Sequence, residues 1–283
     1  MTHWLRNEGG PPIGDYPPMP SLRKYVFIQD DPFYLPKVLD KYLREYHDST
    51  VGVNIQPVVM GKRTAFQTAW ELYRLYGFHY FQWKLRRFVC ARLKAKLING
   101  LLGSTSKFYS IGAVAKKYGV PVHITDDVNG EPFRALLREL KADLIVSISG
   151  TQWYGKKLRE QMPAGIVNCH GALLPKYRGL MPSFWTLANN EHEGGVSVHY
   201  IDGGLDSGPI VVQGRYRINP QDTLEDIMAR SKDMAAELII ESVRRIEAGS
   251  PELLPNPADQ ASQFSVPTRE DVERFRATGH RFF

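Results

Sequence analysis

Three polar side chains in the second half of the sequence have the types and spacing that acid–base chemistry needs. Asn168 and His170 stand two positions apart in the apolar segment GIVNCH, so on a β-strand they point to the same side. Asp206 lies further along, in the glycine-rich segment DGGLDSG, which also contains Asp202. An amide can donate a hydrogen bond to a developing oxyanion, an imidazole can accept a proton, and a carboxylate can support the imidazole. These residues are therefore a candidate catalytic set.

Each member of this set also has a purely structural interpretation. An Asn and a His on one strand are structural more often than catalytic, and an Asp in a glycine-rich turn is favoured because its side chain suits the turn. A metal site formed by His170, Asp202 and Asp206 is a further alternative. The choice depends on whether the fold brings the three groups to one pocket.

The elements that must position these residues alternate along the chain. Short apolar runs alternate with amphipathic helices, which predicts an α/β fold with a mostly parallel, Rossmann-like sheet and helices on both faces. The predicted strands are 24–29, 51–60, 121–125, 143–149 and 165–170. The predicted helices are 34–46, 110–118, 131–141, 154–161 and 180–189. In such sheets ligands bind beyond the carboxyl ends of the strands, where Asn168 and His170 are expected.

After these elements the pattern changes to two β-rich runs. The segments 195–201 and 209–218 predict an antiparallel strand pair near the C-terminal end of the core, joined by the connector that contains Asp206. A long helix is expected at 222–248. The antiparallel pair is the element that would carry Asp206 back toward the strand end.

A long helical stretch from 64 to 102, broken near Gly77, is basic and interleaved with aromatic residues. On a helical projection Leu85 and Val89 share one side with Phe81 and Phe88, while Lys84, Arg87 and Lys94 lie opposite, and Arg92 and Lys96 fall on the apolar side. We expect this helix to pack on the core and to expose its basic face. A role at a membrane surface or toward an acidic substrate is the alternative.

Composition sets broad limits on the class of protein. Hydrophobic residues make up 43% of the chain and charged residues 23%, which allows a sizeable core. The net charge of +6 suits an acidic partner such as a phosphorylated ligand, a nucleic acid or an anionic membrane, although many enzymes carry this charge without one. Cys90 and Cys169 are expected to be reduced thiols. No apolar run reaches the roughly 18 residues of a membrane span, and the N-terminus lacks a signal-peptide pattern, so we expect a cytoplasmic protein.

The segments around the candidate set resemble a known family. The run NCHGALLPKYRG, followed by GVSVHYIDGGLDSGPIVVQ, closely resembles the folate-dependent formyltransferases, which include methionyl-tRNA, glycinamide ribonucleotide and sugar N-formyltransferases. The similarity covers about residues 121–220. It is specific because a loop motif and a distant Asp motif occur together in the right order. The resemblance implies transfer of a formyl group from 10-formyltetrahydrofolate to an amine, without a metal.

The resemblance also implies roles for individual residues. Asn168, His170 and Asp206 match the family's catalytic residues. Folate is expected to meet the segments 148–153 and 201–204. The residues expected to contact it are Ile148, Gly150, Gln152, Asp202, Gly203 and Leu205. The acceptor is expected near Tyr177, Arg178, Pro182 and Trp185, where the arginine could bind phosphate or brace the loop. Ala172 stands where the family often has Ser, so one hydroxyl of the loop is lost.

Formyl transfer passes through a tetrahedral intermediate with negative charge on the former carbonyl oxygen. Asn168 can donate to that oxygen, and His170 can polarise the same oxygen or take the proton from the amine. Asp206 could hold the imidazole in its useful protonation state or relay the proton. A carboxylate so close is expected to raise the pKa of the histidine.

The predicted organisation has three parts. Residues 1–20, dense in Pro and Gly, form a flexible N-terminal arm; residues 21–250 form the formyltransferase catalytic domain; residues 251–283 form a linker and a short helix capped by Thr268.

The acceptor is suggested by two absences. The glycinamide ribonucleotide enzymes of the family have a glycine-rich phosphate loop after the first strand, and the segment DDPFYLP at this place has none. The tRNA enzymes have a β-rich C-terminal domain, for which residues 249–283 are too few. A small amine is therefore expected, such as an amino-deoxysugar linked to a nucleotide, rather than tRNA; a homodimer is compatible with this. The rival hypotheses are a formyltetrahydrofolate hydrolase, with water as acceptor, and a non-catalytic folate-binding protein.

Overall fold

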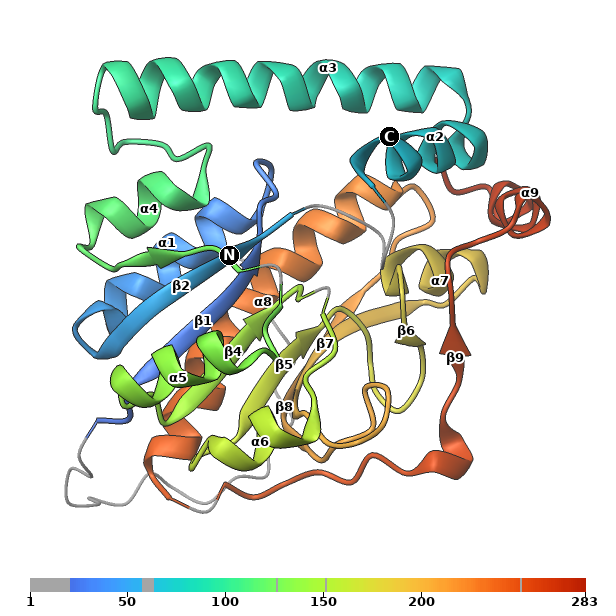
Figure 1. Ribbon diagram of the computed structural model, residues 1–283. Helices are drawn as coiled ribbons and strands as arrows, with labels where there is room; N and C mark the ends of the chain where they lie inside the picture. Colours follow the sequence, from blue (N-terminus) through green and yellow to red (C-terminus); the bar gives the residue numbers. More distant parts are fainter. Residues whose placement is uncertain (1–20, 58–63, 126, 151, 250) are drawn as a thin grey trace.

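The fold is built on one sheet that is buried on both faces. The computed structural model describes residues 21–57, 64–125, 127–150, 152–249 and 251–283. Its main sheet is 7-stranded, in the order β3-β2-β1-β4-β5-β7-β8 (Figure 1). The strands are β1 (Lys24–Gln29), β2 (Thr50–Gln56), β3 (Val122–His123), β4 (Leu144–Ile148), β5 (Ile166–His170), β7 (Glu193–Tyr200) and β8 (Ile210–Arg217). The first five run parallel, whereas β7 and β8 are antiparallel, which confirms the predicted fold class.

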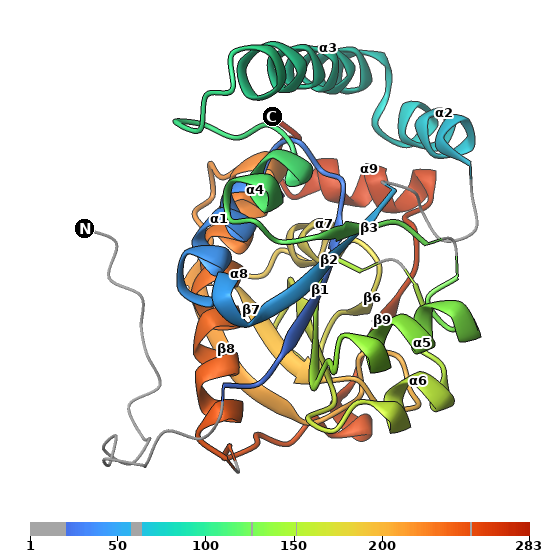
Figure 2. The ribbon, with the colours of Figure 1, turned by 60° about the vertical axis from the view of Figure 1, so that its left-hand side comes forward.

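Helices cover both faces of this sheet. Helices α1, α4 and α8 lie on one face, and α5 and α6 lie on the other (Figure 2). Their bounds are α1 (Leu35–Tyr46), α4 (Ile111–Lys117), α5 (Glu131–Glu139), α6 (Lys156–Gln161) and α8 (Leu224–Glu247). Strand β1 shows why both faces need cover: Val26 and Ile28 belong to one hydrophobic core, and Tyr25 and Phe27 belong to the other. A strand that alternates between two cores reads as a continuous apolar run.

Some predicted boundaries differ from the structure. Strand β2 ends at Gln56, before Pro57, and the predicted continuation over 58–60 lies outside the described residues, as does the predicted arm 1–20. Strand β3 has only two paired residues, Val122 and His123, because it lies at the edge of the sheet and pairs with β2 alone.

The long helical stretch is divided as predicted. Helix α2 (Ala65–Tyr76) ends at Gly77, whose φ of 80° only glycine adopts easily, and α3 (Phe78–Lys94) follows directly. A π-helical segment, η2 (Ala95–Leu101), continues α3. In Figure 1 α3 lies across the top of the molecule, beyond the ends toward which the parallel strands run.

The orientation of α3 differs in part from the one expected: Lys94 is exposed as predicted, whereas the other two basic residues of the predicted solvated face form ion pairs with the body of the protein. Lys84 and Arg87 turn inward to the buried carboxylate of Glu225, at 2.6 and 3.2 Å. Arg92 pairs with Asp30 at 2.7 Å, directly after β1. A buried carboxylate needs cations and hydrogen bonds, and this requirement decides which side of α3 faces the body. Of the apolar side, Leu85 and Val89 are exposed, whereas Phe81 and Phe88 are half-buried.

The C-terminal segment packs against the rest of the chain. Helix α9 (Arg269–Ala277) begins at Thr268, whose side chain forms the predicted cap with Asp271. Phe275 and Phe282 are buried in the main hydrophobic core. Before α9, the chain passes η3 (Ala258–Gln260) and then runs beside the loop after β5, where β9 (Gln263–Phe264) pairs in parallel with β6 (Arg178–Gly179) (Figure 1). Helix α7 (Pro182–Ala188) follows this loop. Within the described part of the chain no helix is long and apolar enough to cross a bilayer.

Candidate functional site

Strand β5 carries the first two residues of the site to the edge where the parallel strands end. Asn168 and His170 alternate along it and so share one side, and Asn168 is paired in register with His199 of the antiparallel neighbour β7. The His170 side chain is buried, whereas Asn168 is half-buried. The position agrees with the general rule that ligands of α/β sheets bind beyond the carboxyl ends of strands.

Asp206 reaches this strand end from the connector between β7 and β8. Its backbone has φ 46°, a left-handed conformation that Asp tolerates better than most residues. One carboxylate oxygen, Oδ2, lies 3.6 Å from Nδ1 of His170, and the other, Oδ1, lies 3.5 Å from Nε2 of His199. The Gly179 N–H donates to Oδ2 at 2.8 Å. The structure thus brings the amide, the imidazole and the carboxylate together.

A hydrogen bond from the loop selects the tautomer of His170. Its Nε2 lies 2.7 Å from the carbonyl oxygen of Tyr177, and a carbonyl can only accept, so Nε2 carries the hydrogen. In the neutral ring Nδ1 is then the basic nitrogen, and Nδ1 is the atom that faces Asp206. A proton arriving on Nδ1 would therefore be stabilised by the carboxylate beside it.

The pKa of His170 is set by opposing effects of burial and of its polar neighbours. Burial lowers the pKa of the imidazole below its ordinary value, although Asp206 and the Tyr177 carbonyl act in the opposite direction. Asp206 therefore raises the pKa of His170 as expected, but burial, whose depth the sequence does not reveal, outweighs this effect. Burial alone would raise the pKa of Asp206, but His170, His199 and the Gly179 N–H together hold it below its usual range. Near neutral pH the pair is a charged carboxylate and a neutral imidazole.

This arrangement predicts the pH behaviour of an Asp206→Asn variant. Because Asp206 raises the pKa of His170 against the effect of burial, removing its charge should lower that pKa further. If neutral His170 is the base, the acid limb of the kcat/KM profile should move to lower pH while the plateau falls. An NMR titration of the His170 ring should give the same shift independently of turnover. An acid limb that stays in place, or moves to higher pH, would contradict this role.

Two residues near the site were not predicted from the sequence. His199 contacts both Asp206 and, at 3.4 Å, the side-chain nitrogen of Asn168. Its place in the alternating run GVSVHYI would have suggested it, since Ser197 and His199 share one side of the strand. Lys232, on α8, donates to the Ser149 hydroxyl at 2.5 Å at the end of β4, and its charge helps to lower the pKa of His170. Nothing in the sequence pattern marked Lys232.

The residues predicted to meet folate lie on the segments beside this site. Ile148 is a buried β4 residue, so only its backbone is available. Gly150 is close-packed: a side chain there would collide with Ser147 and Tyr154. The amide oxygen of Gln152 lies 3.4 Å from the Val128 N–H. These are structural constraints on the first segment, and its folate contacts stay a prediction.

The second predicted folate segment is an exposed turn. Asp202 accepts hydrogen bonds from the Gly204 N–H and the Ser207 hydroxyl, so its carboxylate shapes the turn. Gly203 is exposed and Leu205 is 37% exposed, which leaves both accessible to a ligand. The structure does not bring Asp202 into the cluster of His170 and Asp206, and among the described residues no group of three His, Cys, Asp or Glu side chains is arranged to hold a metal.

The residues predicted to meet the acceptor are largely occupied by structural contacts. The Arg178 guanidinium is buried and bonds to the backbone and side chain of Asn256, which is the loop-bracing alternative. The Trp185 indole donates to the Ser265 carbonyl, and Pro182 starts α7. The Tyr177 side chain bonds to Glu191, while its backbone carbonyl serves His170.

Ala172, where the resemblance leads one to expect Ser, is buried. A hydroxyl from β7 braces the loop at this point: Ser197 donates to the Ala172 carbonyl at 2.7 Å and accepts from the Leu174 N–H at 3.1 Å. Ser197 therefore connects the loop directly to the strand that carries His199.

The C-terminal segment holds both loops of the site. The Asn256 side chain donates to the carbonyl oxygens of Asp206 and Gly208, at 2.8 and 2.9 Å, and accepts from Arg178. This one amide thus fixes the Asp206 turn relative to the loop that contains Tyr177.

An Asn256→Ala variant should therefore lose activity, although Asn256 itself contributes no group to the reaction. We expect a fall in kcat of about tenfold or more, because a displacement of Asp206 misplaces the reacting groups. Asn256→Gln, which keeps the donors, should recover part of the loss, and Gln260→Ala in the same segment should behave as wild type. Equal turnover in Asn256→Ala and wild type would show that the turn holds its position unaided.

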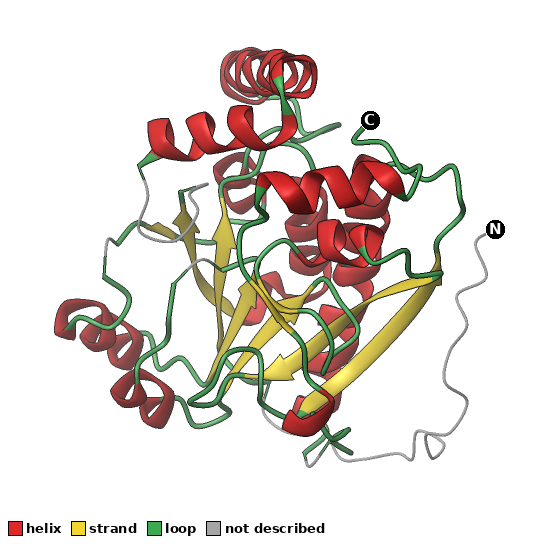
Figure 3. Ribbon diagram, turned by 90° about the vertical axis from the view of Figure 1, so that its right-hand side faces the viewer, coloured by secondary structure: helices red, strands yellow, loops and turns green. Residues whose placement is uncertain are grey.

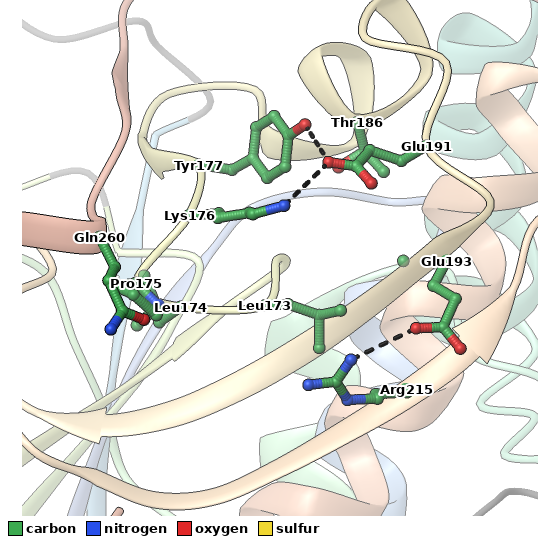
Figure 4. Close-up of a pocket in the computed structure, with 11 residues that line it drawn as sticks. Leu173, Leu174, Pro175, Lys176, Tyr177, Thr186, Glu191, Glu193, Arg215 and Gln260 are labelled. Atoms are coloured by element: carbon green, nitrogen blue, oxygen red, sulfur yellow. Dashed lines mark hydrogen bonds and ion pairs between the residues drawn. The ribbon is translucent and has the colours of Figure 1, made fainter. Parts of the chain in front are cut away.

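A cavity of about 240 Å³ lies behind the loop after β5, and it is not the site described above (Figure 4). Tyr177 and Lys176 meet Glu191 on one side of it, and Arg215 pairs with Glu193 on the other. None of Asn168, His170 and Asp206 lines it.

Cys169, adjacent to His170, is no nucleophile, because burial raises the pKa of its thiol to about 12.

With this geometry in place, comparison with known proteins shows what the chain is similar to. Residues 113–243 match the family model described as formyl transferase. Methionyl-tRNA formyltransferase from Kosmotoga olearia is 40% identical over 164 residues, 56% of this chain and 51% of the relative. The enzyme of the same name from Anaeromyxobacter sp. (strain K) is 35% identical over 159 residues, with the same shares. The chain spans about half the length of these relatives.

Solved structures show the same fold at lower identity. The N-formyltransferase from Helicobacter canadensis, solved in complex with folinic acid and dTDP-3-aminofucose, has a TM-score of 0.58 at 18% identity, covering 91% of this chain and 80% of its own. Phosphoribosylglycinamide formyltransferase from Anaplasma phagocytophilum has a TM-score of 0.56 at 19% identity, covering 85% and 97%. The likeness to both extends over most of the chain.

Proposed function

We propose that this protein transfers a formyl group from 10-formyltetrahydrofolate to a primary amine. The observation that carries the proposal is the meeting of Asn168, His170 and Asp206 at the end of β5, with Nδ1 of His170 facing the carboxylate at 3.6 Å. Two findings support folate as the donor: residues 113–243 match the formyl transferase family model, and the Helicobacter canadensis N-formyltransferase was solved in complex with folinic acid.

In this mechanism the folate supplies the formyl group, and the chain supplies polarisation and proton transfer. Asn168 donates to the oxygen of the transferring group as negative charge develops on it. Neutral His170 takes the proton of the attacking amine on Nδ1, and the charged Asp206 stabilises the imidazolium that results. The same proton is then available for the departing nitrogen of the donor, which leaves His170 neutral for the next turnover.

As acceptor we propose an amino-deoxysugar linked to a nucleoside diphosphate. The loop after β1 supports a choice against glycinamide ribonucleotide: Asp30 pairs with Arg92, and Asp31 accepts the N–H groups of Phe33 and Tyr34. Carboxylates at this strand end disfavour a phosphate there. The dTDP-3-aminofucose in the complex of the Helicobacter canadensis enzyme supports the sugar class.

Methionyl-tRNA is the second candidate acceptor. The observation in its favour is the 40% identity to the Kosmotoga olearia enzyme over 164 residues, more than twice the 18% identity to the sugar enzyme. The choice between the two acceptors therefore needs a direct assay.

The test offers 10-formyltetrahydrofolate with each acceptor separately and follows the tetrahydrofolate released. The panel is a dTDP-linked and a UDP-linked amino sugar, glycinamide ribonucleotide, methionyl-tRNA and no amine. Turnover with an amino sugar alone supports the proposal, and turnover with methionyl-tRNA alone replaces the acceptor. Formate release without any amine would identify a hydrolase, and folate binding without turnover in any arm would identify a binding protein.

A further inference from the structure

The outer side of α3 carries a stripe of exposed apolar residues that the formyl-transfer proposal does not use. Leu85, Val89, Leu93 and Leu97 follow one another at intervals of four, which places them along one side of the helix. Their exposed fractions are 48, 47, 61 and 53%. Leu101, at the end of η2, extends the stripe and is 78% exposed. Figure 3 shows α3 almost end-on at the top of the molecule, with its outer side turned away from the sheet and from the other helices.

Helix α2 and the start of α3 also expose large aromatic side chains. Phe66 is 78% exposed, Trp70 is 53% exposed, and Phe78 is 57% exposed. Trp70 lies 5.5 Å from Tyr73, ring centroid to centroid. Phe78 lies seven positions before Leu85 and so on the same side of α3, and we call Phe78 and the stripe from Leu85 to Leu101 the outer apolar surface. Apolar side chains scattered singly over a protein need no explanation, but a continuous row on a helix does.

The charge of the same segment has one sign. Between Glu71 and Asp126 the sequence contains no Asp or Glu, while it contains ten Lys and Arg residues. Lys84, Arg87 and Arg92 are used inward, on Glu225 and Asp30. The remaining cations of α3 and η2 are Arg86, Lys94 and Lys96, and all three are exposed. An exposed apolar row flanked by cations, without anions, is the pattern of helices that lie in the headgroup region of a membrane.

We propose that the outer apolar surface docks on an anionic lipid bilayer, with the stripe from Leu85 to Leu101 entering the headgroup boundary and Arg86 and Lys96 meeting lipid phosphates. The internal ion pairs hold α3 with this side outward, since Glu225 and Asp30 fix its inner side. Phe78 adds an aromatic ring to this apolar side, as is common in interfacial helices. Binding is parallel to the surface, so it needs no membrane-spanning segment.

The same observations weigh against other occupants. A second copy packed stripe to stripe would bring the cations of two α3 helices together without an acidic residue from this segment, and like charges oppose such contact. A nucleic acid would use the cations, but its phosphates gain nothing from the row of leucines. A bilayer offers apolar and anionic groups in adjacent layers, which matches the distribution on α3.

The test measures co-sedimentation of the full chain with vesicles of phosphatidylcholine alone and with vesicles in which about three lipids in ten are phosphatidylglycerol. We expect the chain to bind the anionic vesicles and to bind the neutral vesicles at least about tenfold more weakly. Leu85→Glu combined with Leu93→Glu should weaken binding to anionic vesicles at least about tenfold. Arg86→Glu with Lys96→Glu should do the same, because each cation near the surface contributes about fivefold.

The matched control is Ile124→Glu, which adds the same charge at an apolar residue that is 79% exposed and outside this surface. It should bind like the wild type, and all variants should keep the wild-type circular dichroism spectrum and formyl-transfer rate with soluble substrates. The proposal is overturned if anionic and neutral vesicles bind equally, or if the double leucine variant binds like the wild type. A dimer of the wild type that the double leucine variant dissociates, measured by light scattering, would also overturn it. The same holds if the variant with Arg86→Glu and Lys96→Glu loses binding to RNA but keeps binding to anionic vesicles.

Discussion

Replacing His170 with alanine is expected to lower kcat at least about a hundredfold, because the change removes the group that takes the proton of the amine. The neutral imidazole is already placed for this role: the Tyr177 carbonyl holds the hydrogen on Nε2, and Nδ1 faces Asp206. Steady-state kinetics with the acceptor identified by the panel would measure the effect. The KM for folate should change much less than kcat.

A buried histidine is also a packing residue, so the loss has to be separated from misfolding. His170→Gln keeps a side-chain N–H that can donate to the Tyr177 carbonyl, but it has no basic nitrogen. It should fold like the wild type, by circular dichroism and thermal melting, and be as slow as His170→Ala. The exposed His192 gives the control, since His192→Ala should retain full activity. A glutamine variant with near-normal turnover would refute the assignment of His170 as the base.

Asn168→Ala is expected to lower the rate of the chemical step by about 10²–10³, the usual cost of losing one oxyanion donor. The nitrogen of the Asn168 side chain lies 3.4 Å from His199, which keeps it on the side of Asp206 and the reacting groups. Single-turnover kinetics would give the rate of the step, and quenching of protein fluorescence would give the folate affinity.

The comparison that isolates the donor is Asn168→Asp, which has nearly the same size and no N–H. Both variants should be slow while folate affinity stays close to that of the wild type. If the alanine variant instead loses affinity and keeps its single-turnover rate, Asn168 acts in binding and the oxyanion role has to be abandoned.

The sheet and part of the site could be predicted because they depend on local patterns. Alternation along GIVNCH placed Asn168 and His170 on one side of β5, and the change from helical to β-rich patterns placed the antiparallel pair. The predictions that failed concern features that depend on contacts between residues distant in the sequence. The face of α3 is set by Glu225, far along the chain from Lys84, and a helical projection of α3 contains no information about that carboxylate.

The bracing of the site was unpredictable for a related reason. Strands β6 and β9 have two residues each, too few to show any periodicity, and the Asn256 contacts lie within a segment that reads as a proline-rich connection. The depth of burial that lowers the pKa of His170 likewise comes from the assembled fold and not from the neighbours of His170 in sequence. His199 could have been predicted, because the alternation that pairs Asn168 with His170 on β5 also sets His199 on one side of β7.

Asn256 donates hydrogen bonds to the Asp206 turn, and Ser262 accepts hydrogen bonds from the backbone N–H groups of Tyr177 and Arg178; these bonds have a consequence for biosynthesis. The parallel strands through β5 can leave the ribosome and pair in order, yet the Asp206 turn and the Tyr177 loop acquire their last ties only when residues 256–264 have emerged. A nascent chain stalled before that point would carry Asn168, His170 and Asp206 without the ties that lock them in place.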